Sequence, residues 1–99
     1  MSHSKLSEIK GVDILAKLEV INLTCNQIIA ITGLDNLRNL EELSLAGNKI
    51  IEISGLNTLI NLTLLDLGGN QITEIKGLKE LRNLRFLYLT NNQITEIRG

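Results

Sequence analysis

Aliphatic residues recur along this chain with a period of 22 residues. Each period reads L-x-x-L-x-L-x-x-N-x-I-x-x-I-x-G-L-x-x-L-x-N, with Ile21 in place of the second leucine in the first period and no insertion in any of them. The pattern divides the sequence into a polar leader (1–5), a half unit (6–17), three full units (18–39, 40–61 and 62–83) and a partial unit (84–99). Chance spacing does not place aliphatic residues at the same positions of every unit. We therefore interpret residues 6–99 as one repeat domain, and we expect the recurring aliphatic residues, here called the ladder, to form its core.

The spacing within one unit predicts the elements. The alternation in L-x-L is that of a β-strand with one buried face. The wider spacing in I-x-x-I-x-G-L-x-x-L favours short helical or 3₁₀ turns over a full helix. A strand followed by a right-handed return places successive strands side by side and parallel. The predicted fold is therefore an α/β right-handed solenoid with turns on its convex face. Its concave face carries a four-stranded parallel sheet, about 15 Å wide, centred on Ile21, Leu43, Leu65 and Leu87.

Two further positions recur with the same period. The ninth position holds Asn26, Asn48, Asn70 and Asn92, and the sixteenth holds Gly11, Gly33, Gly55, Gly77 and Gly99. An amide side chain just after a strand is expected to hydrogen-bond backbone groups of the turn and of the neighbouring unit. A recurring glycine indicates a positive φ or a close approach of two backbones. We therefore interpret both positions as structural, not as a row of ligand-binding amides or a phosphate loop.

The units resemble the 22-residue class of leucine-rich repeats, and the I-x-x-I-x-G-L return is similar to that of the SDS22-like subfamily. Bacterial internalins resemble it too, although they usually carry proline where these units have glycine. The resemblance covers residues 6–99. It implies an intracellular interaction module that binds a protein partner on the concave sheet. Because the type member regulates a serine/threonine phosphatase, the resemblance also implies a phosphatase or another signalling protein as the partner.

Charge and composition argue against several other partners. Ten basic and eleven acidic residues give a net charge of −1, which provides no attraction to nucleic acid or to an anionic membrane. No apolar stretch approaches the roughly 20 residues of a membrane span. Cys25 is the only cysteine, and the N-terminus lacks the apolar segment of a signal peptide. A lone cysteine fits a reducing compartment, so we expect a cytoplasmic protein.

Catalytic chemistry is not indicated. His3 is the only histidine and lies in the polar leader, so neither a nucleophile–histidine pair nor a metal site is expected. Glu41 and Glu42 are adjacent on a strand and are expected to point to different faces, which is poor geometry for an acid/base pair. Gly68 and Gly69 lack the lysine and the spacing of a phosphate-binding loop. We therefore predict no enzyme activity, no cofactor and no metal.

The residues between the buried aliphatic positions of each strand are expected to face the open, concave side. The candidate partner-binding residues are Val20, Asn22, Glu42, Ser44, Leu64, Asp66, Arg85, Phe86 and Tyr88. Phe86 and Tyr88 are the only aromatic residues, and both fall on the open face of the last strand, beside Leu64. Exposed aromatic residues are the usual anchors of protein interfaces. A second interpretation remains open, in which the two rings only support each other on a small terminal sheet.

Other surface features carry weaker predictions. Acidic residues on the first three strands favour a basic or arginine-bearing partner; they are Glu19, Glu41, Glu42 and Asp66. The small residues Ala46, Gly47, Gly68 and Gly69 predict a shallow dip beyond the strands. On the return segments, Ile29, Ile51 and Ile60 form either a second apolar patch or part of the convex wall.

The ends of the solenoid suggest an alternative function. Only a half unit precedes the first predicted strand, and the sequence given stops before the turn that would cover the last unit. Open repeat ends and bare strand edges favour pairing with another copy. A self-assembling structural protein, forming a homo-oligomer through its ends, is therefore the alternative to a module that binds a different protein. A fragment of a longer repeat array explains the same features.

Overall fold

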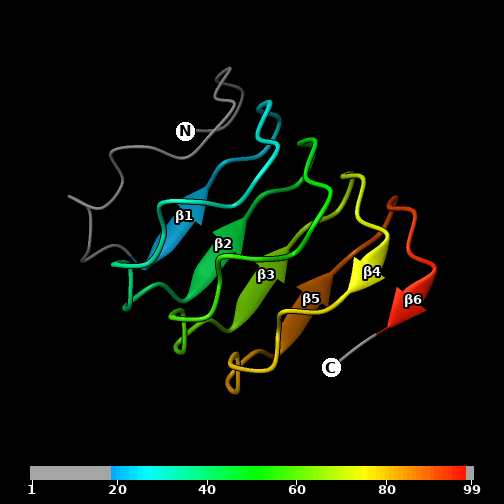
Figure 1. Cartoon of the computed structure of the whole chain (residues 1–99). Helices are drawn as coiled ribbons and strands as arrows, with labels where there is room; N and C mark the ends of the chain where they lie inside the picture. The colour runs from blue at the N-terminus through cyan, green and yellow to red at the C-terminus, as the bar shows by residue number, and fades with distance from the viewer. Residues whose placement is uncertain (1–18, 98–99) are drawn as a thin grey trace.

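The computed structural model describes residues 19–97 (Figure 1). The predicted leader (1–5) and half unit (6–17), together with Gly11 and Gly99, lie outside the described residues. The strands are β1 (Val20–Asn22), β2 (Glu42–Ser44), β3 (Leu64–Asp66), β4 (Glu74–Ile75), β5 (Phe86–Tyr88) and β6 (Glu96–Ile97).

Four of these strands form the predicted parallel sheet, in the order β1-β2-β3-β5. Their central residues, Ile21, Leu43, Leu65 and Leu87, are paired from strand to strand, so each step across the sheet advances the sequence by one unit. In Figure 1 the four arrows lie side by side and point the same way. The periodicity thus predicted the sheet, its register and the solenoid correctly.

The return segments consist of tight turns. In each full unit two successive i→i+3 hydrogen bonds close the L-x-x-L-x-x-L stretch. In the first full unit, Leu37 N–H donates to the Leu34 carbonyl and Leu40 N–H donates to that of Leu37, both at 3.0 Å. This is the hydrogen bond of a 3₁₀ turn, as the spacing predicted. Residues 19–97 contain no continuous helix, and the buried leucines at every third position all point from these turns into the core.

A second, two-stranded parallel sheet pairs β4 with β6 on the wall opposite β5 (Figure 1). The sequence analysis did not predict it. Both strands lie in the segment Q-I-T-E-I, which occurs in the third full unit and in the partial unit. There the Thr95 N–H donates to the Thr73 carbonyl at 2.8 Å, so the two segments approach closely enough to pair. The threonine before each of these strands also suits extended backbone.

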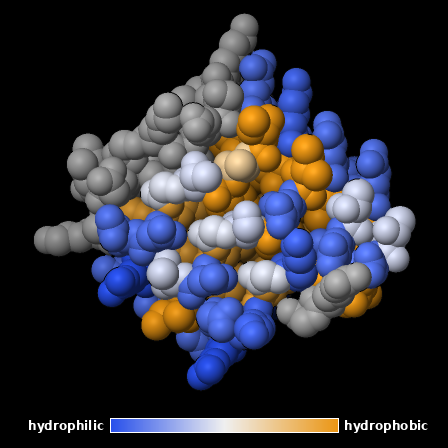
Figure 2. Space-filling model, viewed as in Figure 1, coloured by the Kyte–Doolittle hydropathy of each residue, from blue (hydrophilic) through white to orange (hydrophobic). Residues whose placement is uncertain are grey.

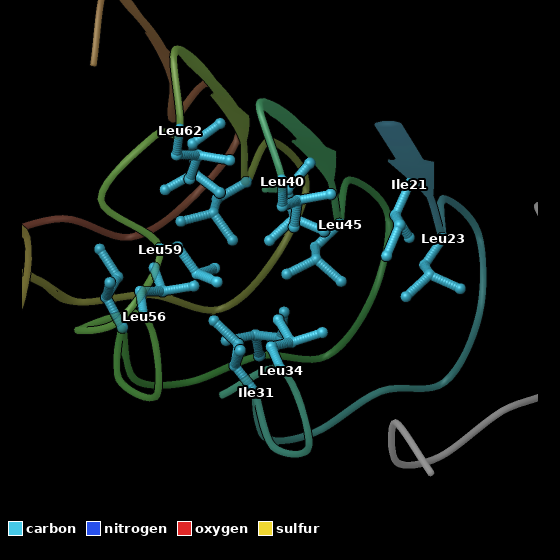
Figure 3. Packing of buried hydrophobic residues seen from close by; sticks show 14 of the residues in the cluster. Ile21, Leu23, Ile31, Leu34, Leu40, Leu45, Leu56, Leu59 and Leu62 are labelled. Carbon is cyan, nitrogen blue, oxygen red and sulfur yellow. The ribbon is translucent and has the colours of Figure 1, made fainter. Parts of the chain in front are cut away.

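The aliphatic ladder fills the space between the sheet and the return wall. Figure 3 shows Ile21, Leu40 and Leu45 of the sheet wall pointing towards Leu34 and its neighbours in the return wall. Leu43, Leu65 and all ladder residues between them have exposed fractions of 1% or less. The prediction that the whole ladder is core is wrong at its last member, since Ile97 is 78% exposed. Among the described residues the last unit has a neighbour on one side only, so its ladder residues are less covered.

The recurring asparagines and glycines have the structural roles that the sequence predicted. Asn26, Asn48 and Asn70 are buried, with exposed fractions of 6%. Among the described residues no buried side-chain nitrogen or oxygen lacks a hydrogen bond. Gly33, Gly55 and Gly77 have φ values between 71° and 77°, in the left-handed region where glycine is favoured.

Cys25 also has a left-handed backbone, with φ 58°, at the position that Gly47 and Gly69 occupy in later units. Its side chain is exposed, which supports its interpretation as a turn residue. We expect Cys25→Val to lower the free energy of unfolding by about 1–3 kcal/mol, because a β-branched residue is strained at this φ. Cys25→Gly should change it by less than about 1 kcal/mol. Urea denaturation followed by circular dichroism measures both; equal stability of the two variants would contradict the left-handed conformation.

Candidate partner-binding surface

At the start of β2, β3 and β5, one backbone carbonyl of the neighbouring unit accepts two hydrogen bonds. Two consecutive N–H groups donate to one carbonyl: those of Glu41 and Glu42 to Glu19, those of Thr63 and Leu64 to Glu41, and those of Arg85 and Phe86 to Thr63. The distances are 2.7–3.1 Å. The register of the strands stays one-to-one, so the shared carbonyl extends the hydrogen bonding by one residue before each strand without an inserted residue. Glu41 and Glu42 are both exposed, so neither side chain belongs to the core.

The structure places all nine candidate residues on the outer face of the four-stranded sheet or at its rim. Two rows cross the strands in register, namely Val20, Glu42, Leu64 and Phe86, then Asn22, Ser44, Asp66 and Tyr88. Arg85 directly precedes β5, at the rim of the sheet, and is exposed. The placement was therefore predicted correctly, while the role of these residues in binding stays a prediction.

The aromatic residues form a continuous apolar patch with one neighbour. Leu64 is paired directly with Phe86 on the adjacent strand and is half-buried. Phe86 is 52% exposed and Tyr88 is 46% exposed. Both rings thus offer exposed surface to a partner, while their role in binding stays a prediction. Val20 is exposed as well, but Glu42 and Leu64 separate it from Phe86, and it lies outside the patch.

Asp66 lies beside Tyr88 and has a fixed orientation. Its carboxylate accepts a hydrogen bond from the Gly68 N–H at 3.0 Å. Gly68 is buried, and a Cβ added there would meet the Thr90 hydroxyl at 3.2 Å and the Asp66 carboxylate at 3.3 Å. The dip predicted from the row of small residues is therefore filled at Gly68. Asp66 instead provides an oriented acceptor at the edge of the aromatic patch.

A polar hollow of about 520 Å³ lies next to the patch, at the edge where the strands begin. It is lined by Glu41, Asn61, Thr63, Arg82, Asn83, Leu84 and Arg85. The sequence analysis missed Arg82 and the two asparagines. The signal that could have found them is asparagine at the last position of each unit, because Asn61 and Asn83 each donate to a carbonyl of the preceding unit at 2.9 Å.

The return wall is apolar in places. Ile29, Ile51 and Ile60 are 54–58% exposed, so they are not buried in the convex wall. Ile51 and Ile60 line different hollows, so whether the three form one patch stays a prediction. Figure 2 shows apolar side chains reaching the surface of this side between polar ones. Next to Ile51, Lys76 forms an ion pair with Glu52 at 2.9 Å.

Residues 19–97 hold no group of three or more His, Cys, Asp or Glu side chains arranged to bind a metal ion. No helix within the same residues has the length and apolar character needed to cross a bilayer.

Comparison with known proteins identifies the class. The family model described as "Leucine Rich repeats (2 copies)" matches residues 38–80 and again 60–99, which together exceed half of the chain. The chain belongs to the leucine-rich repeat family. Domains of this family generally mediate protein–protein interactions. Comparison with curated proteins finds no match.

Solved structures of internalins from Listeria monocytogenes are similar in fold. The internalin InlF matches with a TM-score of 0.82 at 27% identity, over 94% of this chain and 32% of InlF. Internalin C2 matches with a TM-score of 0.59 at 29% identity, over 96% of this chain and 57% of that one. The functional domain of InlJ matches at 23% identity with a TM-score of 0.67, over 92% of this chain and 24% of its own, which shows the fold alone. The chain thus spans between a quarter and somewhat over half of these proteins.

Proposed function

We propose that this chain is a protein-interaction module that binds a protein partner on the outer, concave face of its four-stranded sheet. The observation that carries the proposal is the patch of Phe86, Tyr88 and Leu64. The two half-exposed aromatic side chains lie on β5, whose register with β3 is fixed by the buried ladder. A rigid scaffold presents them without loss of backbone freedom, which favours binding. The interaction role of the leucine-rich repeat family supports the same function.

The finer predictions from the sequence stay predictions. They are that the chain is an SDS22-like module, that its partner is a phosphatase or another signalling protein, and that it acts in the cytoplasm. The exposed thiol of Cys25 is compatible with a reducing compartment. Self-association through the repeat ends remains the alternative function. Catalysis has no residue set to support it among residues 19–97, and we propose binding in its place.

We expect the double variant Phe86→Ala, Tyr88→Ala to lose partner binding without loss of fold. One interface anchor contributes about 2 kcal/mol or more, and the contributions of two neighbouring anchors do not simply add. The affinity of the double variant should therefore fall by at least the roughly thirtyfold expected for one anchor. Because both side chains are half exposed, the free energy of unfolding should change by less than about 1 kcal/mol. Quantitative mass spectrometry of the proteins captured from a cell lysate measures the loss, and a urea titration checks the fold.

A matched control is the double variant Ile29→Ala, Ile51→Ala, which removes apolar surface of similar exposure from the return wall. It should capture the same proteins as the unaltered chain. Capture that survives the loss of both aromatic side chains, or that disappears in the isoleucine variant, would place the interface on another surface and overturn the proposal.

A further inference from the structure

The polar hollow beside the aromatic patch carries unused positive charge. Arg82 and Arg85 both line it, and both are exposed. Neither forms an ion pair or a side-chain hydrogen bond with another described residue. Each guanidinium group has five N–H donors in a planar arrangement that matches a carboxylate. The hollow therefore holds two cationic groups that have donors available.

The other polar side chains of the hollow are already engaged. The amides of Asn61 and Asn83 donate to backbone carbonyls, and the Thr63 hydroxyl donates to the Glu41 carbonyl at 3.1 Å. Glu41 supplies the one carboxylate of the lining, against two guanidinium groups, so the hollow has an excess of positive charge. Glu41 and Arg85 start strands that are two steps apart in the sheet, roughly 10 Å. A ligand group that fits this charge distribution is an anion placed at the Arg85 end, away from Glu41.

The position of the hollow relative to the patch identifies the ligand. Arg85 and Phe86 are consecutive, and their N–H groups donate to the same Thr63 carbonyl, at 2.8 and 3.0 Å. A segment of a partner whose apolar side chain rests on Phe86 and Leu64 thus brings its neighbouring side chain to the hollow. Recognition of a protein by an apolar anchor with an adjacent charge contact is common in protein interfaces.

We infer that the hollow binds an acidic side chain of the protein partner, aspartate or glutamate, directly beside an apolar side chain that is held by the aromatic patch. This inference rests on the proposed function, since it names the partner chemistry of the same face. It also revises the expectation of a basic partner. Of the four acidic residues behind that expectation, Glu19, Glu41 and Glu42 lie towards β1 and β2 and Asp66 lies at the far end of β3, whereas the basic pair lies towards β5, at the edge where the strands begin. The charge on this edge of the face changes from negative near β1 and β2 to positive near β5. A bound segment is therefore oriented with its acidic residue at the β5 side.

The test uses a displayed library of short random peptides selected on four forms of the chain. These are the unaltered chain, Phe86→Ala with Tyr88→Ala, Arg82→Glu with Arg85→Glu, and Lys49→Glu with Lys79→Glu. The lysine variant is the matched control, because it changes the net charge equally at exposed residues outside the hollow. Circular dichroism of each variant confirms the fold.

Peptides selected on the unaltered chain should be enriched in an acidic residue next to a large apolar one. A synthetic peptide from that selection should bind the arginine variant at least about tenfold more weakly and the lysine variant with similar affinity. Replacing its acidic residue by the matching amide should weaken binding to the unaltered chain about tenfold and leave binding to the arginine variant nearly unchanged, as expected for a direct pair in a double-mutant cycle.

Selected peptides without an acidic excess, or with equal affinity for the arginine variant, would overturn the inference while leaving the proposed function in place, provided that binding still needs Phe86 and Tyr88. Binding that does not need these two side chains would overturn the proposed function itself. If every peptide that binds the unaltered chain also binds the variant without the two aromatic side chains, both the inference and the proposed function are contradicted.

Discussion

Replacing Asn48 by alanine is expected to lower the free energy of unfolding by about 3–5 kcal/mol. The Asn48 side chain is buried and joins two units. Its oxygen accepts from the Ile28 N–H at 3.1 Å. Its nitrogen lies 2.8–3.2 Å from three carbonyls, those of Leu23, Leu45 and Ala46.

The partners differ in what the substitution leaves behind. Each of the three carbonyls keeps a second donor, from Asn26, Asn70 and the Cys25 N–H respectively. The Ile28 N–H keeps none among the described residues, and Ile28 is fully buried. A buried donor without a partner costs about 1–3 kcal/mol, and the two N–H groups of the lost amide, shared among the three carbonyls, contribute about 1 kcal/mol each. The orphaned Ile28 N–H is thus the largest single contribution.

Asn92→Ala is the matched control. Asn92 makes the same set of contacts, accepting from the Ile72 N–H at 3.0 Å and donating to Leu67, Leu89 and Thr90, but it is only partly buried. Water can replace the lost hydrogen bonds there, so we expect a loss of only about 1–2 kcal/mol. Urea denaturation of both variants measures the difference. Equal losses would show that the repeated asparagine acts through the turn of its own unit and not through burial between units.

Gly55→Ala is expected to destabilise the fold by about 2–5 kcal/mol, the second large effect. Gly55 has φ 74°, and a Cβ added there would overlap the Ile31 carbonyl oxygen of the preceding unit. Since that oxygen belongs to the backbone, relief requires the two units to move apart. Strain at the left-handed φ and overpacking between units therefore add to each other.

Gly69→Ala separates the two causes. Gly69 has a similar φ of 66°, but the atom nearest to an added Cβ is the Gly47 nitrogen at 3.4 Å, an ordinary contact. Only the backbone strain of about 1–2 kcal/mol should remain. Thermal and urea denaturation of both variants provide the comparison. A Gly55→Ala variant as stable as Gly69→Ala would contradict the close packing of the two return segments.

These two glycine positions also show how far the sequence predicts the fold. The sixteenth position is glycine in every unit because it needs both the left-handed φ and the space. The eighth position holds Cys25, Gly47, Gly69 and Asn91, all at positive φ. The sixteenth position could be recognised from the sequence because one residue type recurs there. The eighth position could not, because it requires only a conformation that several residue types can adopt.

The sheet and its register followed from the sequence because a period of 22 residues without insertions leaves one way to stack the units. The positions of Phe86, Tyr88 and Leu64 on the outer face followed from the same register. The hollow did not, because it combines Glu41, Thr63 and Arg85 from three successive units, whose N–H groups and carbonyls meet at the strand starts. No spacing within a single unit indicates that contact between units. The β4–β6 sheet was missed for a similar reason, since its two residues per strand are too short to give an alternation.

The central claim is that the outer face of the four-stranded sheet is the binding surface. Backbone amide NMR of the labelled chain, titrated with a peptide selected on it, tests this claim most directly. The account predicts that the largest shifts fall on β3 and β5, at Leu64, Asp66, Phe86 and Tyr88, with small changes on the return wall. Large shifts at Ile29 and Ile51 with an unchanged β5 would contradict it.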